Sequence, residues 1–507
     1  MVLAGPDGTV RMRIPWITVF LVAGTVVRVA HALLFKPWLQ AADHLAWDIV
    51  LKSVGHVGGL GYWQLIHYPQ EGGSIPISAL TLLIGRIPGV AALPVSALLV
   101  DALSRWIQLK VVSDRFDRRV FLLFGAWTVT GLPILITWSS VNCGLHSVAS
   151  FFPFLMLRLV TAPAAGPVQG WRDGALCGLF IWFTYDCVLL LPLYAIALFR
   201  QTRAFDRAAR FIAALFAVLG AHLAVRSLFD AGFHLPEWGP ASVRGLDFQR
   251  PLGKMVHDIG TVWVRAVPGS SLLPGLFGIE VRLVRCCWAL FVLAGAIGCW
   301  WVGRTWPAQR LSLFACVLAV ISFAVGYAIS PLAVHQADHP SYMYYRHWAF
   351  ILPMIALMTI AGLAGSRAGR IAAWGFVGLG AMGVMTMFRV PPSREVDLLD
   401  TGFVLALKLG HDPARLEAVI GNVPEHAPEL FIGAGWGTAE ELIVFNQPTP
   451  EDTEHLISLV NSYNPAPRAL LIEGVDLALS RNGRDRITEA TRRRVHDGLR
   501  PDRSEMR

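Results

Sequence analysis

Uninterrupted or nearly uninterrupted apolar runs recur along the first 390 residues of the chain. Several approach the roughly 20 residues that a helix needs to cross the hydrocarbon core of a bilayer. The runs lack the apolar–polar alternation of a membrane barrel strand, so the α-helix is the spanning element that they predict. They lie at residues 14–27, 119–138, 143–157, 174–185, 187–199, 211–225, 286–302, 311–330, 348–364 and 371–388. The pattern predicts an all-α polytopic membrane domain over residues 1–390.

Charged residues between the runs indicate how the helices are oriented. Arg and Lys gather in short connectors, as they do on the cytoplasmic side of membrane proteins. These connectors lie at residues 11–13, 101–119, 200–210, 303–310 and 366–370. With a cytoplasmic N-terminus, about 11 transmembrane helices place the long connections on the opposite side. Those connections are the loops 36–75, 229–282 and 331–345 and the C-terminal tail. The unbalanced loops fit a bacterial inner (plasma) membrane, without being unique to it.

The stretch 172–199 is the ambiguous part of this topology. A single crossing would put Asp186 near the bilayer centre, where an ionised carboxylate is costly. Two short helices hinged near Asp186 would keep the carboxylate at a tip on the far side and leave the arginines that follow in the cytoplasm. We therefore predict the pair of helices.

The chain changes character at the segment Arg389-Val390-Pro391-Pro392. Beyond it, charged residues become more frequent and apolar runs shorten. A capping residue followed by proline is a typical helix start, and Asp412-Pro413 and Thr449-Pro450 have this form. Residues 391–507 are therefore expected to form a small, soluble, mostly helical domain outside the cytoplasm. Its helices are expected within 394–408, 412–421, 451–463 and 485–499.

The overall composition agrees with a membrane protein and narrows its partners. Hydrophobic residues make up 54% of the chain and charged residues 15%, and the net charge of +8 is explained by the cytoplasmic connectors. No basic stretch is interleaved with aromatic residues, so nucleic acid is not an expected partner. Membrane lipid is an expected partner because of the apolar runs. There is no Gly-rich phosphate loop after a strand and no DxD motif between strands, which disfavours a nucleotide-sugar donor. The seven cysteines lack CxxC spacing and are expected to be buried thiols.

The loop 36–75 has the densest set of residues suited to catalysis. It contains Asp43, His44, Asp48, His56, His67 and Glu71. Residues 42–54 are predicted to form an amphipathic helix that rests at the membrane surface and holds Asp43 at headgroup level. The alternative is that Asp43 only caps this helix or faces solvent. A flexible, Gly-rich segment follows and could close over a ligand.

Two segments resemble the C-type (GT-C) membrane glycosyltransferases, a superfamily that uses polyprenyl-phosphate sugars. The first combines Arg28 near the end of the first helix, Asp43 in a long external loop, and Tyr68-Pro69-Gln70-Glu71 before the next helix. The second runs from His339 to Trp348 through Tyr345, Arg346 and His347, and leads into a helix that contains Pro353. The resemblance covers roughly residues 10–390 in architecture, and its motifs are short.

The resemblance implies a transferase that moves one sugar from a polyprenyl-phosphate donor to a lipid, glycan or protein acceptor on the extracytoplasmic face. It implies Asp43 as the general base and Arg346 as a partner of the donor phosphate, and a carboxylate and a guanidinium suit these roles. Glu71 is a second catalytic candidate. The candidates for substrate contact are Arg28, His44, His67, Tyr345, Arg346 and His347.

The chain departs from the family pattern at three positions. His44 stands where many relatives have a second acid, and Asn142 and His146 stand where their second external loop often offers another. A divalent cation held by Asp43 with His67 or Glu71 is possible in chemical terms but is not required.

Two other classes of function stay open. A polysaccharide or lipid-carrier exporter or flippase would distribute polar residues through the helix centres, whereas here the acids and histidines concentrate at one membrane face. A surface-polysaccharide polymerase or ligase usually relies on a large late external loop, for which 229–282 is available.

Overall fold

The computed structural model describes most of the 507 residues. These are residues 13–53, 74–141, 148–162, 168–201, 205–229, 253, 281–329, 346–389, 396–409, 412–444, 449–481 and 487–499. Every regular element within these ranges is a helix, and none of these residues forms a strand, which confirms the predicted all-α class. The chain divides into two compact units. Unit 1 comprises Met1–Lys36 and Gln70–Pro392, and unit 2 comprises Pro37–Pro69 and Ser393–Arg507.

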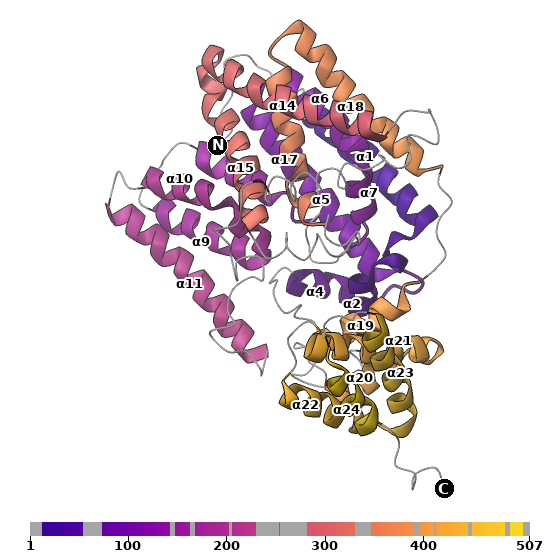
Figure 1. The fold of residues 1–507 in the computed structure, drawn as a ribbon. Helices are drawn as coiled ribbons and strands as arrows, with labels where there is room; N and C mark the ends of the chain where they lie inside the picture. The colour runs from indigo at the N-terminus through magenta and orange to yellow at the C-terminus, as the bar shows by residue number, and fades with distance from the viewer. Residues whose placement is uncertain are drawn as a thin grey trace. The chain divides into compact units, whose positions relative to one another are not determined.

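Unit 1 contains all the described apolar helices that are long enough to span a membrane (Figure 1). In chain order the helices of unit 1 are α1 (Arg13–Phe35), α4 (Ser74–Ile84), α5 (Ala92–Arg115), α6 (Arg118–Thr130), α7 (Pro133–Trp138), α8 (Phe152–Thr161), α9 (Val168–Phe183), the 3₁₀ helix η3 (Tyr185–Leu190), α10 (Leu191–Gln201), α11 (Phe205–Phe229), α14 (Val281–Thr305), α15 (Pro307–Ile329), α17 (Arg346–Leu363) and α18 (Arg367–Met387).

Five helices in the described ranges are long and apolar enough to cross a membrane. They are the apolar parts of α1, α11, α14, α15 and α18, at Pro15–Phe35, Phe205–Ala224, Cys286–Thr305, Gln309–Ile329 and Arg367–Met387. α8, α10 and α17 are apolar but shorter, and so is the segment Leu398–Leu407 of unit 2. The structure thus supports a protein with several membrane-spanning helices, while the larger number of about 11 stays a prediction.

Two apolar stretches of unit 1 are each divided into separate helices. The stretch 119–138 is divided because Gly131 adopts a positive φ of 57° and Pro133 starts the next helix, so α6 ends and α7 begins in a new direction. The stretch 172–199 is divided at Thr184, where α9 gives way to η3 and then to α10. The hinge near Asp186 is therefore confirmed, and its carboxylate is buried inside unit 1.

Close helix contacts in unit 1 depend on glycine. A Cβ at Gly295 or Gly298 of α14 would overlap backbone atoms of α17, at Thr359 and Gly362 respectively. The two helices approach so closely because neither glycine has a side chain. This contact fixes α17 against α14.

Unit 2 combines one early helix with the C-terminal helices. It contains α2 (Ala42–Ser53), α19 (Leu398–Lys408), α20 (Pro413–Ile420), α21 (Ala427–Ala439), α22 (Pro450–Asn461), α23 (Pro465–Arg481) and α24 (Glu489–Leu499), with short turns η2 (Pro37–Gln40), η6 (Pro424–His426) and η7 (Glu440–Val444). Asp412 caps α20 and Thr449 caps α22, as the sequence predicted. α21 and α23 were absent from the predicted segments.

The helix expected at 42–54 exists as α2, but its surroundings differ from the expected membrane surface. Ala42, Ala46, Ile49 and Val50 join one apolar core with residues of α19 to α24. The apolar face that predicted a membrane-surface helix is therefore covered by protein within unit 2. The division into units assigns Pro37–Pro69 to unit 2, and the predicted domain 1–390 stays a prediction.

Candidate functional site

Asp186 and His347 form a buried hydrogen-bonded pair within unit 1. Asp186 lies on η3 and is fully buried, and His347 is the second residue of α17 with 1% of its surface exposed. The Asp186 Oδ1 atom is 3.0 Å from His347 Nδ1. The break between α9 and α10 brings the carboxylate to this position. A ring contact with Tyr327 of α15, at 6.4 Å between centroids, supports the imidazole from another helix.

In this pair a carboxylate positions the imidazole of a histidine. A carboxylate that accepts a hydrogen bond from Nδ1–H of a neutral histidine fixes the tautomer and leaves the lone pair on Nε2. Such an imidazole can take a proton from a hydroxyl or amine, and the carboxylate stabilises the imidazolium that results. Sequence reasoning named both residues separately but did not predict that they meet, because 161 residues separate them along the chain.

The neighbours of His347 were also predicted as ligands. Arg346 is the first residue of α17, and its side chain lies outside the described part of the structure. Tyr345 lies outside the described residues altogether, as do His67 and Glu71. The expected roles of these four residues stay predictions.

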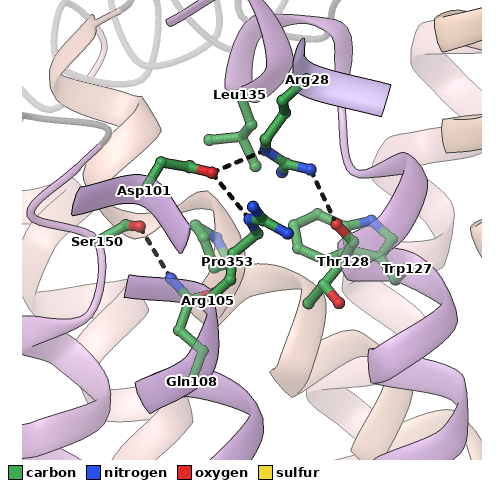
Figure 2. A pocket seen from close by; sticks show the side chains of 9 residues that line it. All are labelled: Arg28, Asp101, Arg105, Gln108, Trp127, Thr128, Leu135, Ser150 and Pro353. Atoms are coloured by element: carbon green, nitrogen blue, oxygen red, sulfur yellow. Dashed lines mark hydrogen bonds and ion pairs between the residues drawn. The ribbon is translucent and has the colours of Figure 1, made fainter. Parts of the chain in front are cut away.

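A second polar cluster is buried between α1, α5 and α6 of unit 1. The Asp101 Oδ2 atom is 3.0 Å from Arg28 Nε and 2.8 Å from Arg105 Nε, so one carboxylate serves two guanidinium groups. Figure 2 shows the Asp101 carboxylate beside both arginines and joined to each of them, with Gln108 and Ser150 on one side of the cluster and Thr128 on the other. The three charged side chains are between 3% and 7% exposed.

Hydrogen bonds to other elements hold this cluster in place. Arg28 Nη1 donates to the Gly24 carbonyl at 3.0 Å and to the Thr128 carbonyl at 3.2 Å. Arg105 Nη1 donates to the Leu21 carbonyl at 3.2 Å, and its Nη2 donates to Thr25 Oγ1 at 2.9 Å. The cluster thus joins α5 to α1 and α1 to α6.

A small hollow lies beside the cluster. Its volume is about 10 Å³, and it is lined by Arg28, Asp101, Arg105, Gln108, Trp127, Thr128, Leu135, Ser150 and Pro353. Gln108 Nε2 donates to Ser150 Oγ at 2.9 Å and to Ser104 Oγ at 3.2 Å. Pro353 is on α17, six residues after His347, or ~9 Å along the helix axis.

The sequence predicts a crossing at about 89–112 that ends among the basic residues of the connector 101–119, and the helix observed there is α5, from Ala92 to Arg115. Asp101 and Arg105, which the charge pattern counted with the connector, are buried within this helix. An Asp and an Arg four residues apart within a predicted crossing were the available sequence signal, because such a pair faces one side of a helix.

The predicted catalytic helix α2 places Asp43 and His44 inside unit 2. Asp43 is 4% exposed in the first turn, and His44 is fully buried. Burial lowers the pKa of His44 to about 3, with a smaller contribution from the positive charge of Lys52. His44 is therefore neutral at physiological pH. Arg28, Arg346 and His347 belong to unit 1, so the expected meeting of Asp43 with Arg346 stays a prediction.

A divalent cation was considered for Asp43 with His67 or Glu71. Within the ranges that the structure describes, no group of three or more His, Cys, Asp or Glu side chains could hold a metal ion. Since His67 and Glu71 lie outside these ranges, that proposed set is not tested.

Comparisons with known proteins give no assignment. No family model, no curated protein and no solved structure matches the chain. The resemblance to GT-C glycosyltransferases therefore depends on the two sequence segments alone.

Proposed function

We propose that the protein is a membrane glycosyltransferase that moves one sugar from a polyprenyl-phosphate donor to an acceptor on the extracytoplasmic face. The observation that carries the proposal is the buried Asp186–His347 pair at the start of α17, next to Arg346. It adds an oriented base to a segment that already resembles the family. Several apolar helices long enough to cross a membrane suit a lipid-carried donor.

In the proposed reaction, His347 Nε2 removes the proton from the acceptor hydroxyl or amine. The acceptor atom forms the new bond to the anomeric carbon, and the bond from this carbon to the phosphate oxygen breaks with its electron pair remaining on the phosphate. Arg346 is proposed to neutralise the leaving phosphate. Asp186 acts as the positioning residue, since its carboxylate holds the imidazole and stabilises its protonated form.

The proposal is tested by sugar transfer in the purified protein. The parent, His347→Gln and Asp186→Asn would be incubated with radiolabelled polyprenyl-phosphate sugars and membrane extract as acceptor. We expect both variants to lose transfer about 100-fold or more, as removal of a general base usually does. His496→Gln is the matched control, because His496 and Asp476 form an exposed pair at 3.3 Å in unit 2.

Asp43→Asn separates this assignment from the base that the family resemblance implies. Loss of transfer in Asp43→Asn with full activity in His347→Gln would reject His347 and restore Asp43. Full activity in both folded variants would remove both residues from the proton transfer.

A transporter of a lipid-carried glycan is the second candidate, and the Arg28–Asp101–Arg105 cluster favours it. Such a protein needs polar residues within its helix interiors, and this cluster supplies them. In proteoliposomes with a fluorescent polyprenyl-phosphate sugar, a transporter would move the lipid between leaflets with its sugar still attached. A transferase would release the sugar to an acceptor without needing that movement.

A further inference from the structure

We propose that the hollow beside Arg28 and Arg105 binds a single halide-sized anion, with chloride as the natural occupant. This inference is independent of the proposed function, because it concerns the charge and the space around one buried cluster.

The first argument is the charge of the cluster. Arg28 and Arg105 carry two positive charges, and Asp101 is the one carboxylate in the described part of the chain that pairs with them. The cluster therefore has a net charge of +1 within the apolar interior of unit 1. Carbonyl oxygens of α1 and α6 accept hydrogen bonds from the guanidinium groups but carry no full charge. A buried net charge favours a counter-ion.

The second argument is a hydrogen-bond donor beside the cluster. Trp127 of α6 lines the hollow and is 1% exposed. Its indole Nε1–H has no acceptor among the described residues. Since buried N–H groups normally have a partner, the indole suits an anion that also contacts the arginines. The hydroxyl of Thr128 is already used, because it donates to the Gly125 carbonyl at 2.7 Å.

The third argument is the size of the hollow. Its volume of about 10 Å³ corresponds to about one water-sized sphere. A tetrahedral phosphate with four oxygens is larger than one water-sized sphere. A monatomic anion requires only a small adjustment of the lining side chains, and its charge neutralises the cluster. Water fits as well but leaves the net charge of +1 in place.

The test is the thermal stability of the purified full-length protein in detergent at constant ionic strength. Chloride or bromide would be titrated against gluconate, an anion too large for the hollow. We expect a saturable rise of Tm with both halides and none with gluconate. Trp127→Phe keeps the ring and removes the donor, so it should raise the half-saturating halide concentration about tenfold. Trp171→Phe is the control, since Trp171 is 49% exposed on α9.

Three results would overturn the proposal. They are equal Tm values in chloride and gluconate, an unchanged halide response in folded Trp127→Phe, and a larger stabilisation by inorganic phosphate than by chloride. If Trp127→Phe does not fold, a second measurement on the parent protein still tests the site. Crystals of the parent protein grown in bromide should show an anomalous peak bordered by Arg28, Arg105 and Trp127, and a peak absent from this position would reject the site.

Discussion

Acidification from about pH 7 to about pH 5 is expected to loosen helix α2 within unit 2, because His44 is held neutral. The side chain is fully buried in the folded protein, and burial lowers its pKa from 6.5 to about 3. Once α2 opens, the imidazole regains its ordinary pKa and takes up a proton. The opened state therefore binds more protons than the folded state between these two pKa values, and lower pH favours opening.

The size of the effect follows from the two pKa values. Stability that depends on neutral His44 is fully present above about pH 6.5 and decreases by about 1.4 kcal/mol for each pH unit below it. At about pH 5 the loss is roughly 2 kcal/mol relative to about pH 7, or about a 25-fold rise in the population of opened α2. The loss stops only when the pH falls below the folded pKa of about 3.

Amide hydrogen exchange of the full-length protein measures this opening. Peptides from Ala42–Ser53 should lose about 25-fold in protection at the lower pH, after correction for the intrinsic exchange rate. The variant His44→Leu should remove most of the pH dependence, while His496→Gln should keep it because His496 is 45% exposed. A slope in His44→Leu equal to that of the parent would refute the reasoning.

Three further predictions concern stability in detergent. Asp101→Asn leaves two buried guanidinium groups without a carboxylate and should lower the free energy of unfolding by about 3–5 kcal/mol, measured by thermal unfolding. The control Asp114→Asn removes a half-exposed pair with Lys110 and should lower it by less than about 1 kcal/mol. Equal losses in the two variants would contradict this. Gly298→Ala puts a Cβ against the α17 backbone and should lower the free energy of unfolding by about 1–3 kcal/mol. In the control Gly378→Ala, the new Cβ meets nothing within 4 Å, so stability should not fall. The reverse order would reject the α14–α17 contact. Asp412→Ala removes the N-cap of α20 and should lower the stability of unit 2 by about 1 kcal/mol, measured as faster amide exchange in α20. Unchanged exchange would show that the cap does not stabilise this helix.

The sequence predicted the helices of unit 1 well because membrane helices are defined by local apolar length. The apolar run 211–225 lies within the observed helix α11, Phe205–Phe229, and the hinge at Asp186 followed from the cost of a charge in the bilayer. The break at Gly131 was missed, since a glycine inside an apolar run is common in membrane helices and only its positive φ marks the break.

The candidate site was harder to predict because it depends on contacts between distant residues. Asp186 and His347 were each noticed, yet nothing local shows that η3 and α17 meet. Arg105 was assigned to a basic connector on charge alone, although Asp101 four residues before it marked a pair on one helix face. The apolar face of α2 was predicted correctly. The helices that cover it lie beyond residue 393, too far along the chain for a local pattern to indicate them.

Because unit 2 is built from two distant segments of the chain, one segment is synthesised well before the other. Of the two segments of unit 2, residues 37–69 leave the ribosome before the other. The whole stretch 70–392 is then synthesised before the C-terminal helices of unit 2 appear. At about 5–20 residues per second, this delay is roughly 15–65 s. During that time the apolar side of α2 has no permanent partner and is open to chaperones, proteases and lipid. The nascent chain must also cross the membrane an even number of times in between, since both segments have to arrive in the same compartment before unit 2 can form.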